Sequence, residues 1–384
     1  MGKKVYYLDH AAATPLDERV FLAMQPYLKD EFYNPASSYE GGRRARTALE
    51  TARSKIASLL GAKPADIVFT AGATESIHIA IDGVLSAGGH AVIGATEHAA
   101  VRSAVEPYAH SVAAADKRGL VTAEAVEAAL QDDTVIVSVA LADSEIGTVQ
   151  PLAEIARALE AVRQKRRETG NPTPLYLHSD GSQAANTMDL KVSRLGIDML
   201  SLNAAKCYGP KQVGLLWLKP SVQIKPFMTG GGQERGLRSG TENVAGAVGF
   251  AMALELAQKG AHSESARLRG LRRDLLKRLQ SALPELVIDG HSKRYLPGHI
   301  HLHLAGLDAE RVVFHLDNDG VYIATGAACA ANKDTRSPAL SAIGLTPDEA
   351  DGSLRITLGH LNEAADIPKL AEKIINAIGV ERNL

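Results

Sequence analysis

The middle of the chain alternates short runs of apolar, often β-branched residues with longer amphipathic stretches. Four of the runs predict buried strands, at residues 67–70, 91–94, 134–139 and 175–178. Helical patterns lie between them, at residues 122–131 and 153–169. This alternation predicts an α/β fold with a mostly parallel sheet covered on both faces. Ligands of such sheets bind beyond the carboxyl ends of the strands, so the residues that follow the strands are the first site candidates.

The chain has 384 residues, more than one hydrophobic core usually serves, so we expect a large and a smaller domain. We expect residues 1–15 to join the small domain, residues 16–260 to form the large domain and residues 261–384 the small one. A charged stretch at 262–278 predicts a long helix that starts the second domain. The alternation in residues 299–304 predicts a half-buried strand with three histidines on a solvated face, which we favour over a metal site.

Composition argues against several classes of function. Lys plus Arg (42) nearly cancels Asp plus Glu (44), and aromatic residues make up 4%, so we expect no direct contact with nucleic acid.

No apolar run approaches the roughly 20 residues that span a bilayer, and no signal-peptide core follows Met1, so we expect a cytoplasmic protein without a membrane segment. Cys207 and Cys329 alone are too few for a zinc or iron–sulfur motif, and we expect no metal.

Two segments that follow strands carry groups suited to a phosphate and to an aromatic ring. Residues 70–76 are mostly small, so backbone N–H groups and the Thr74 hydroxyl can converge on an anion at the start of a helix. An ordinary strand–helix turn is the alternative. Asp180 follows another strand, where a carboxylate can sit under a pyridine ring and keep its nitrogen protonated. For Asp180 the alternative is an exposed turn.

Lysine and cysteine supply two candidate nucleophiles. Lys206 is flanked by small or apolar residues, a setting that suits an amine to Schiff-base formation. Lys211, beside a Gly-Pro turn, is the competing candidate, and either lysine alone is also typical of a protein surface. Cys329 stands among small residues that would leave a thiol accessible, although a buried structural cysteine would fit the same composition.

Taken together, the order and spacing of these segments resemble the cysteine desulfurases of the class V aminotransferase group. The resemblance runs almost from end to end of the chain, so it is far more specific than any single motif. Its matching segments are residues 7–15, 34–38, 72–75, 96–98, 145–148, 180–183, 206–211, 230–234, 238–243, the loop around Cys329, and 352–355.

The resemblance implies a pyridoxal 5'-phosphate (PLP) enzyme of fold type I, with a large PLP-binding domain and a smaller α+β domain that carries the Cys329 loop. It implies catalytic roles for Lys206, which holds the cofactor, Cys329, which receives sulfur, and His98, which stacks on the cofactor ring. It implies further cofactor contacts from Ala73, Thr74, Asp180, Gln183, Asn203 and Thr241, the last reaching across a dimer interface. It implies that the substrate carboxylate meets Arg355, with Asn34 and Ser144 nearby.

The activity implied is conversion of L-cysteine to L-alanine, with the sulfur passed to Cys329 as a persulfide. The long stretch between Cys329 and Arg355 is similar to that of the long-loop class. The implied partners are a second copy of the chain and a sulfur-acceptor or iron–sulfur scaffold protein, for cluster assembly or tRNA thiolation. Selenocysteine lysis, transamination and a catalytically weak scaffold are the rival hypotheses. Cys207 occupies a position that is usually apolar in relatives, so we interpret it as packing.

Three departures from the family pattern lie at the cofactor. Ala205 stands where relatives carry a phosphate-contacting His, Asn203 replaces a phosphate-binding Ser, and Asp143-Ser144 replaces an Asn pair. Loss of a charge-assisted phosphate contact costs on the order of 1.5–3 kcal/mol. The Asn203 amide can still donate a hydrogen bond and recover part of this. We therefore expect weaker retention of PLP and altered turnover.

Overall fold

The computed structural model describes residues 4–326 and 337–382. The larger unit is built on a seven-stranded sheet of order β2-β8-β7-β6-β5-β3-β4. Only β8 runs antiparallel to its two neighbours, so the other six strands point the same way. The predictions of a mostly parallel sheet and of its four buried strands are confirmed. The strands are β2 (Ile67–Thr70), β3 (His90–Gly94), β4 (His110–Ala113), β5 (Thr134–Ser138), β6 (Tyr176–Asp180), β7 (Met199–Asn203) and β8 (Gly214–Leu218).

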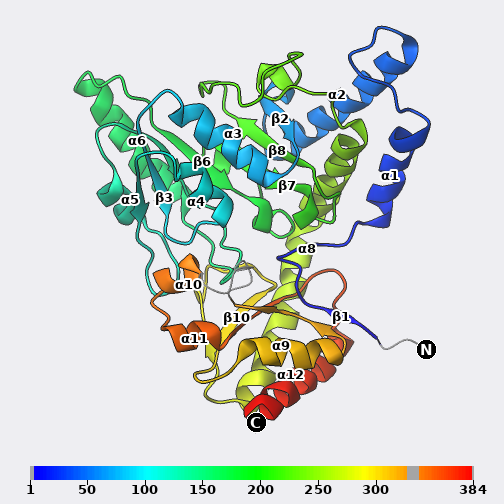
Figure 1. Cartoon of the computed structure of the whole chain (residues 1–384), viewed down its shortest axis with the longest axis vertical. Coiled ribbons are helices and arrows are strands. Elements are labelled where there is room, and N and C mark those ends of the chain that lie inside the picture. Colours follow the sequence, from blue (N-terminus) through cyan, green and yellow to red (C-terminus); the bar gives the residue numbers. More distant parts are fainter. Residues whose placement is uncertain (1–3, 327–336, 383–384) are drawn as a thin grey trace.

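Helices cover both faces of this sheet (Figure 1). Because side chains alternate along a strand, Val68 packs on one face while Ile67 and Phe69 pack on the other. The Val68 face is covered by α3 (Ala73–Leu85) and α4 (Ala99–Val105). The opposite face is covered by α2 (Glu40–Leu60), α5 (Ala123–Ala129), α6 (Leu152–Glu168), α7 (Val192–Leu195) and the first half of α8 (Val244–Ala282), and α1 (Glu18–Lys29) packs on α8. Cys207 lies buried in this core, as predicted, and burial raises the pKa of its thiol to about 12.

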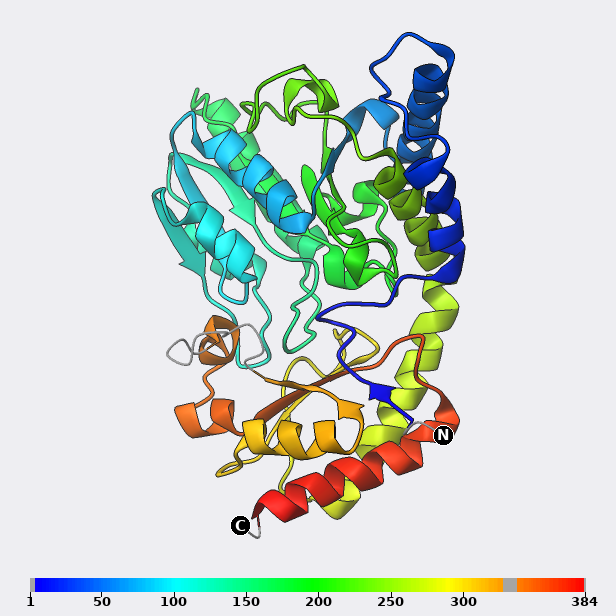
Figure 2. The same cartoon turned by 45° about the vertical axis from the view of Figure 1, so that its right-hand side comes forward.

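The smaller unit has its own core around an antiparallel four-stranded sheet of order β12-β13-β10-β9. Leucines from the second half of α8 form one side of that core. Both β1, which pairs with β11, and the final helix α12 lie at this end of the molecule (Figures 1 and 2). The elements are β1 (Tyr6–Tyr7), β9 (Val287–Ile288), β10 (His299–His303), α9 (Ala309–Asn318), β11 (Val321–Tyr322), β12 (Ala324–Thr325), α10 (Pro338–Ala342), α11 (Pro347–Asp351), β13 (Ser353–Thr357) and α12 (Ile367–Arg382).

Helix α8 differs from the sequence-based expectation of a helix over 262–278. It begins at Val244 and runs through both units as one helix of 39 residues. Its first half is rich in Ala and Gly and is buried around Phe250 and Leu254, so it lacks the charged face that marked the second half. The expected boundary at residue 260 therefore falls inside a continuous helix.

The prediction of a half-buried β10 with solvated histidines is wrong, because all five residues of the strand are buried. Asp289 accounts for the burial of two of the histidines: its carboxylate lies 2.8 Å from Nδ1 of His301 and 3.0 Å from Nδ1 of His303. A polar side chain with a hydrogen-bond partner can be buried at much lower cost. Across the described ranges, no group of three or more His, Cys, Asp or Glu side chains is arranged to hold a metal ion.

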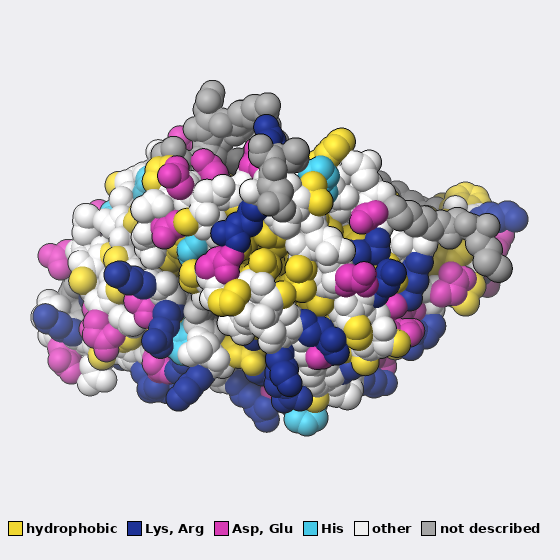
Figure 3. All heavy atoms as spheres, turned by 90° about the horizontal axis from the view of Figure 1, so that it is seen from below, with side chains coloured by type: hydrophobic (Ala, Val, Ile, Leu, Met, Phe, Trp, Pro, Cys, Tyr) yellow, Lys and Arg dark blue, Asp and Glu magenta, His cyan; other side chains and the backbone are white. Residues whose placement is uncertain are grey.

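The small-unit end, seen from below in Figure 3, carries basic and acidic side chains interspersed rather than segregated. Within residues 4–326 and 337–382, no helix combines the length and the apolar character needed to cross a bilayer.

Candidate active site

A cavity of about 340 Å³ lies at the carboxyl ends of the parallel strands. Loops after β2, β3, β5, β6 and β7 contribute to it, as the topology of a parallel sheet requires. The small unit contributes a side chain from β13, and the segment after β1 closes another wall. Of the residues singled out from the sequence, those that line the cavity are Ala73, Thr74, His98, Asp143, Ser144, Asp180, Gln183, Asn203, Lys206 and Arg355.

Thr74 stands in the first turn of α3, directly after β2. The N-terminus of this 13-residue helix lies at the cavity, so its unpaired N–H groups and dipole favour an anion there. Gly72 precedes the helix with φ +141°, and a Cβ placed on it would meet no atom within 4 Å. The segment therefore combines a conformation that favours glycine with open space at a helix N-terminus.

Lys206 ends the short turn after β7 and projects into the cavity. Its Nζ donates to the carbonyl oxygens of Ala11, at 2.7 Å, and Ala12, at 2.6 Å. Lys211, the competing candidate, is exposed and does not line the cavity. Of the two lysines considered from the sequence, the structure therefore places Lys206, and not Lys211, in the cavity.

Asp180 ends β6, and its Oδ1 accepts a hydrogen bond of 2.9 Å from the Ser182 N–H. Gln183 lies three residues further on, with Nε2 donating to the Ala11 carbonyl at 3.1 Å. Ser182 Oγ is buried and has no hydrogen-bond partner among the described residues, although Ser182 lines the cavity. This side of the cavity therefore offers a carboxylate, an amide and an unsatisfied hydroxyl.

His98 caps the N-terminus of α4, where its Nδ1 accepts a 3.0 Å hydrogen bond from the Ala100 N–H. This contact fixes the ring at the wall of the cavity. The preceding residue, Glu97, is fully buried and its Oε1 accepts a 2.6 Å hydrogen bond from the Ala140 N–H. Burial raises the pKa of the Glu97 carboxyl to about 8, and the nearby charges of Asp180 and Asp143 add to the shift.

Arg355 comes from β13, in the middle of the small sheet, and only 4% of its side chain is exposed. Its Nη2 donates to Asp9 Oδ1 at 2.8 Å and its Nη1 donates to the Ser144 carbonyl at 3.3 Å. A guanidinium has five N–H donors, so the remaining ones can serve a further carboxylate. The small unit thereby places a fixed cation at the edge of the cavity.

Three residues singled out from the sequence are not brought into this cavity. Asn34 lies in the connection between α1 and α2, where its Oδ1 accepts from the Ala36 N–H at 2.8 Å. Thr241 lines a separate pocket, together with Thr70 and Arg238. Cys329 lies outside the described residues. The roles assigned to these three remain predictions, as do the roles of the residues that line the cavity.

Two of the residues that depart from the family pattern support the backbone around the cavity. Asn203 Oδ1 accepts from the Ala205 N–H at 3.1 Å, so the side chain of Asn203 stabilises the turn that carries Lys206. Asp143 is buried, and its Oδ1 accepts from the N–H groups of Glu145 and Ile146 at 2.8 and 2.6 Å. Its carboxylate therefore orders the loop whose Ser144 carbonyl meets the guanidinium.

Sequence reasoning missed the cavity roles of Ala11, Ala12 and Ser182. Alanine carries no functional group, and Ala11 and Ala12 act through their carbonyl oxygens, so the only signal for them was their place in the matching segment 7–15. Ser182 lay inside the segment 180–183 but was assigned no role.

Comparison with known proteins agrees with the geometry. The family model for class-V aminotransferases matches residues 6–370. Cysteine desulfurase IscS of Dictyoglomus turgidum is 37% identical over 377 residues, covering 95% of this chain and 92% of that protein. Cysteine desulfurase IscS 1 of Archaeoglobus fulgidus is 36% identical over 381 residues, covering 97% and 96%. A solved NifS-like protein superposes with a TM-score of 0.88 at 28% identity, covering 98% of this chain and all of that one.

The chain belongs to the cysteine desulfurases of the class-V aminotransferase family. Its cofactor is PLP, as predicted. The cavity fits PLP: the α3 N-terminus suits the phosphate, the Asp180 carboxylate suits the ring nitrogen, and the Lys206 amine suits the aldehyde. The unsatisfied Ser182 hydroxyl supplies a further donor for a polar ligand.

Proposed function

We propose that the chain removes sulfur from L-cysteine, releases L-alanine and passes the sulfur to Cys329 as a persulfide. The observation that carries this proposal is the convergence of Lys206, Asp180 and Arg355 on one cavity in a chain of this family. A Lewis-basic amine, a carboxylate and a fixed guanidinium are the three groups that an amino-acid substrate and PLP require. Arg355 binds the substrate carboxylate and orients the Cα–H bond for proton removal.

When bound, PLP supplies an electron sink for the pair released at the substrate α-carbon. The Asp180 carboxylate would hold the ring nitrogen and keep a proton on it. Lys206 Nζ, inside the cavity, takes the α-proton and can return it. The His98 ring, held by the Ala100 N–H, would stack on the cofactor and exclude water from that face.

The sulfur-transfer step is carried by the Cys329 thiolate. The thiolate attacks the substrate sulfur, and the new S–S bond forms as the Cβ–S bond breaks. The electron pair of the broken bond stays on carbon, which takes up a proton and leaves as the methyl group of alanine. The sulfane sulfur of the Cys329 persulfide then passes to an acceptor or iron–sulfur scaffold protein, for cluster assembly or tRNA thiolation.

A cysteine-dependent assay tests this proposal directly. Purified protein is incubated with PLP, its absorbance spectrum is recorded, and L-cysteine and reductant are added while alanine and sulfide are quantified. We expect alanine from the wild type, none from Cys329→Ala, and near-normal amounts from the matched control Cys207→Ala, since Cys207 is a packing residue. Bound cofactor without alanine would favour transamination, and parallel assays with selenocysteine would detect a preference for selenium.

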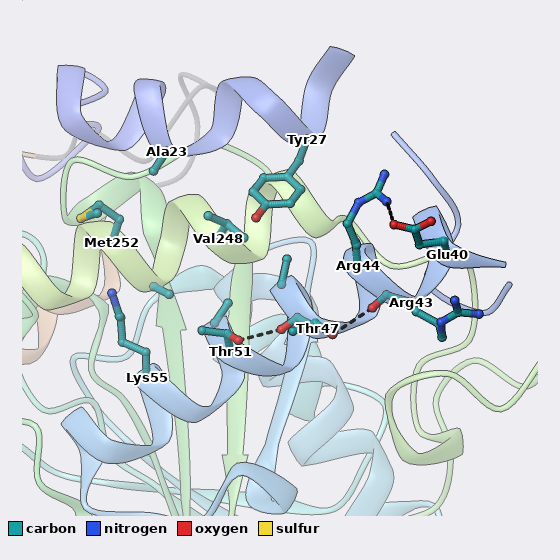
Figure 4. A pocket seen from close by; sticks show the side chains of 13 residues that line it. Ala23, Tyr27, Glu40, Arg43, Arg44, Thr47, Thr51, Lys55, Val248 and Met252 are labelled. Carbon is teal, nitrogen blue, oxygen red and sulfur yellow. Dashed lines mark hydrogen bonds and ion pairs between the residues drawn. The ribbon is translucent and has the colours of Figure 1, made fainter. Parts of the chain in front are cut away.

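We further propose that the active form is a homodimer. Thr241 and Asn34 lie outside the cavity of their own chain, which supports a role at the partner's site. Large apolar side chains on and after α1 are exposed, including Leu28 (60%) and Phe32 (70%). Beside them α1, α2 and α8 line a groove of about 530 Å³, shown in Figure 4. A second copy covering this face would bury that apolar surface.

Mixing two inactive variants tests the dimer and the role of Thr241 together. Each site would use Lys206 of one chain and Thr241 of the other. Co-refolding Lys206→Ala with Thr241→Ala should then produce one intact site per mixed dimer and restore alanine formation. If Thr241 served its own chain, mixing would restore nothing.

We also propose a cytoplasmic location, because a catalytic thiol such as Cys329 requires a reducing compartment.

A further inference from the structure

The segment 7–15, whose role the resemblance left open, places a carboxylate against Arg355. Asp9 Oδ1 accepts a 2.8 Å hydrogen bond from Nη2 of Arg355, and the Asp9 side chain is 21% exposed. The Ser144 carbonyl accepts from Nη1 at the longer distance of 3.3 Å. Asp9 is therefore the only charged group within salt-bridge distance of this guanidinium among the described residues.

Hydrogen bonds between the two backbones also hold this ion pair in place. Asp9 forms a parallel β-bridge with Thr357, two residues beyond Arg355 on the same strand. The Thr357 N–H donates to the Leu8 carbonyl at 2.7 Å, and the Ala11 N–H donates to Thr357 Oγ1 at 2.9 Å. The two charged side chains thus project from backbones that are hydrogen-bonded to each other, which limits the ways in which the pair can rearrange.

The guanidinium is not saturated by these contacts. Its Nε is buried and has no hydrogen-bond partner in the described part of the chain. Two of the five N–H donors of an arginine are engaged here, by Asp9 and Ser144, so donors remain for a carboxylate ligand. A carboxylate that binds beside Asp9 gains hydrogen bonds but also meets the negative charge of Asp9.

We propose that Asp9 is a positioning residue for the substrate carboxylate, which holds Arg355 in its cavity-lining orientation and offsets part of its charge. The inference rests on the proposed function, because it concerns the carboxylate of L-cysteine and of the product L-alanine. Holding the guanidinium favours binding, while offsetting its charge favours release of alanine after each turnover. In this proposal the Asp9 carboxylate contacts neither the α-carbon nor the sulfur of the substrate, and it acts through Arg355 alone.

Two variants of the PLP-loaded enzyme distinguish the effect of holding the Arg355 guanidinium from the effect of offsetting its charge. Asp9→Asn keeps an oxygen acceptor for Nη2 and removes the charge, whereas Asp9→Ala removes both. L-alanine is the probe, and its dissociation constant is measured by the change in cofactor absorbance. We expect Asp9→Asn to bind alanine roughly tenfold more tightly than the wild type and Asp9→Ala to bind it roughly tenfold more weakly. The matched control is Asp274→Asn, which removes one charge from an exposed pair with Arg278 on α8 and should change nothing.

The cysteine reaction provides a second readout. Asp9→Ala should raise KM for L-cysteine more than it lowers kcat, and Asp9→Asn should lower KM and make alanine a stronger inhibitor. Alanine affinity unchanged in Asp9→Ala, or as weak in Asp9→Asn as in Asp9→Ala, would overturn the proposal. A wild type that binds alanine but forms none from cysteine would refute the desulfurase activity instead, and the comparison of alanine affinities would still decide the role of Asp9.

Discussion

Glu97 gives the sharpest prediction about stability. Its carboxyl is fully buried, and burial raises its pKa from 4.5 to about 8. In the unfolded chain the same carboxyl loses its proton near its ordinary pKa. Between these two values the folded state binds more protons than the unfolded state, so the free energy of unfolding falls as the pH rises. The contribution of Glu97 is therefore fully present below pH 4.5 and is lost progressively up to about pH 8.

The size of the pH effect on the free energy of unfolding is set by the shift in the pKa of Glu97. One pH unit within this window changes the free energy of unfolding by about 1.4 kcal/mol for one proton. From pH 6 to pH 8 the loss amounts to roughly 2–3 kcal/mol, which corresponds to a few degrees in Tm for a protein of this size. Glu97→Gln removes the charge at every pH and keeps an oxygen that can accept from the Ala140 N–H.

The assay is thermal unfolding of the wild type and Glu97→Gln from pH 5.5 to 8.5, at one scan rate and with and without PLP. We expect the Tm of the variant relative to the wild type to rise steadily with pH, because other titrating groups affect both proteins equally. Glu160→Gln is the control, since the Glu160 side chain is 56% exposed, and its difference from the wild type should stay small and change little. A flat difference for Glu97→Gln would mean that the folded protein holds Glu97 ionised, and would refute the reasoning from burial.

Three further predictions concern packing, charge and the cofactor. Arg53→Met should lower the free energy of unfolding by about 3–5 kcal/mol in denaturant titrations, because it leaves the Glu234 carboxylate buried without the 2.8 Å pair that neutralises it. Gly326→Ala should cost about 1–3 kcal/mol in the same measurement, since a Cβ there would overlap the hydroxyl of Ser353. Ala205→His should restore a charge-assisted phosphate contact and tighten PLP binding roughly tenfold or more in equilibrium dialysis, and an unchanged affinity would mean that the missing histidine is compensated elsewhere.

The large-domain sheet was predictable because its strands are local signals. Each buried strand is a short apolar run bounded by polar residues, and a parallel sheet brings the loops after its strands together at one edge. Thr74, Asp180 and Lys206 therefore meet in the cavity as their positions after β2, β6 and β7 imply. A local pattern sufficed here, since the geometry of the fold brings these strand ends together.

The small unit was less predictable because its burial depends on distant partners. The histidines of β10 look solvent-facing in sequence, and it is Asp289, 12 and 14 residues earlier in the connection between β9 and β10, that gives His301 and His303 the hydrogen bonds that offset their burial. The first half of α8 has no amphipathic pattern because helices and sheet surround it. In both places tertiary contacts overrode the local pattern, as they do wherever a residue finds its partner far along the chain.

The pairing of Asp9 with Arg355 shows the same dependence on distant partners within the site itself. The two residues stand 346 positions apart, so no periodicity connects them. Each is nonetheless fixed by a local rule: Arg355 faces the cavity by strand alternation in β13, and Asp9 is held by the bridge between its own backbone and Thr357. In the proposed site, the segment around Asp9 therefore orients the cation that β13 supplies for the substrate carboxylate. A substitution that loosens β1 from β11 should for this reason alter alanine binding as well as stability.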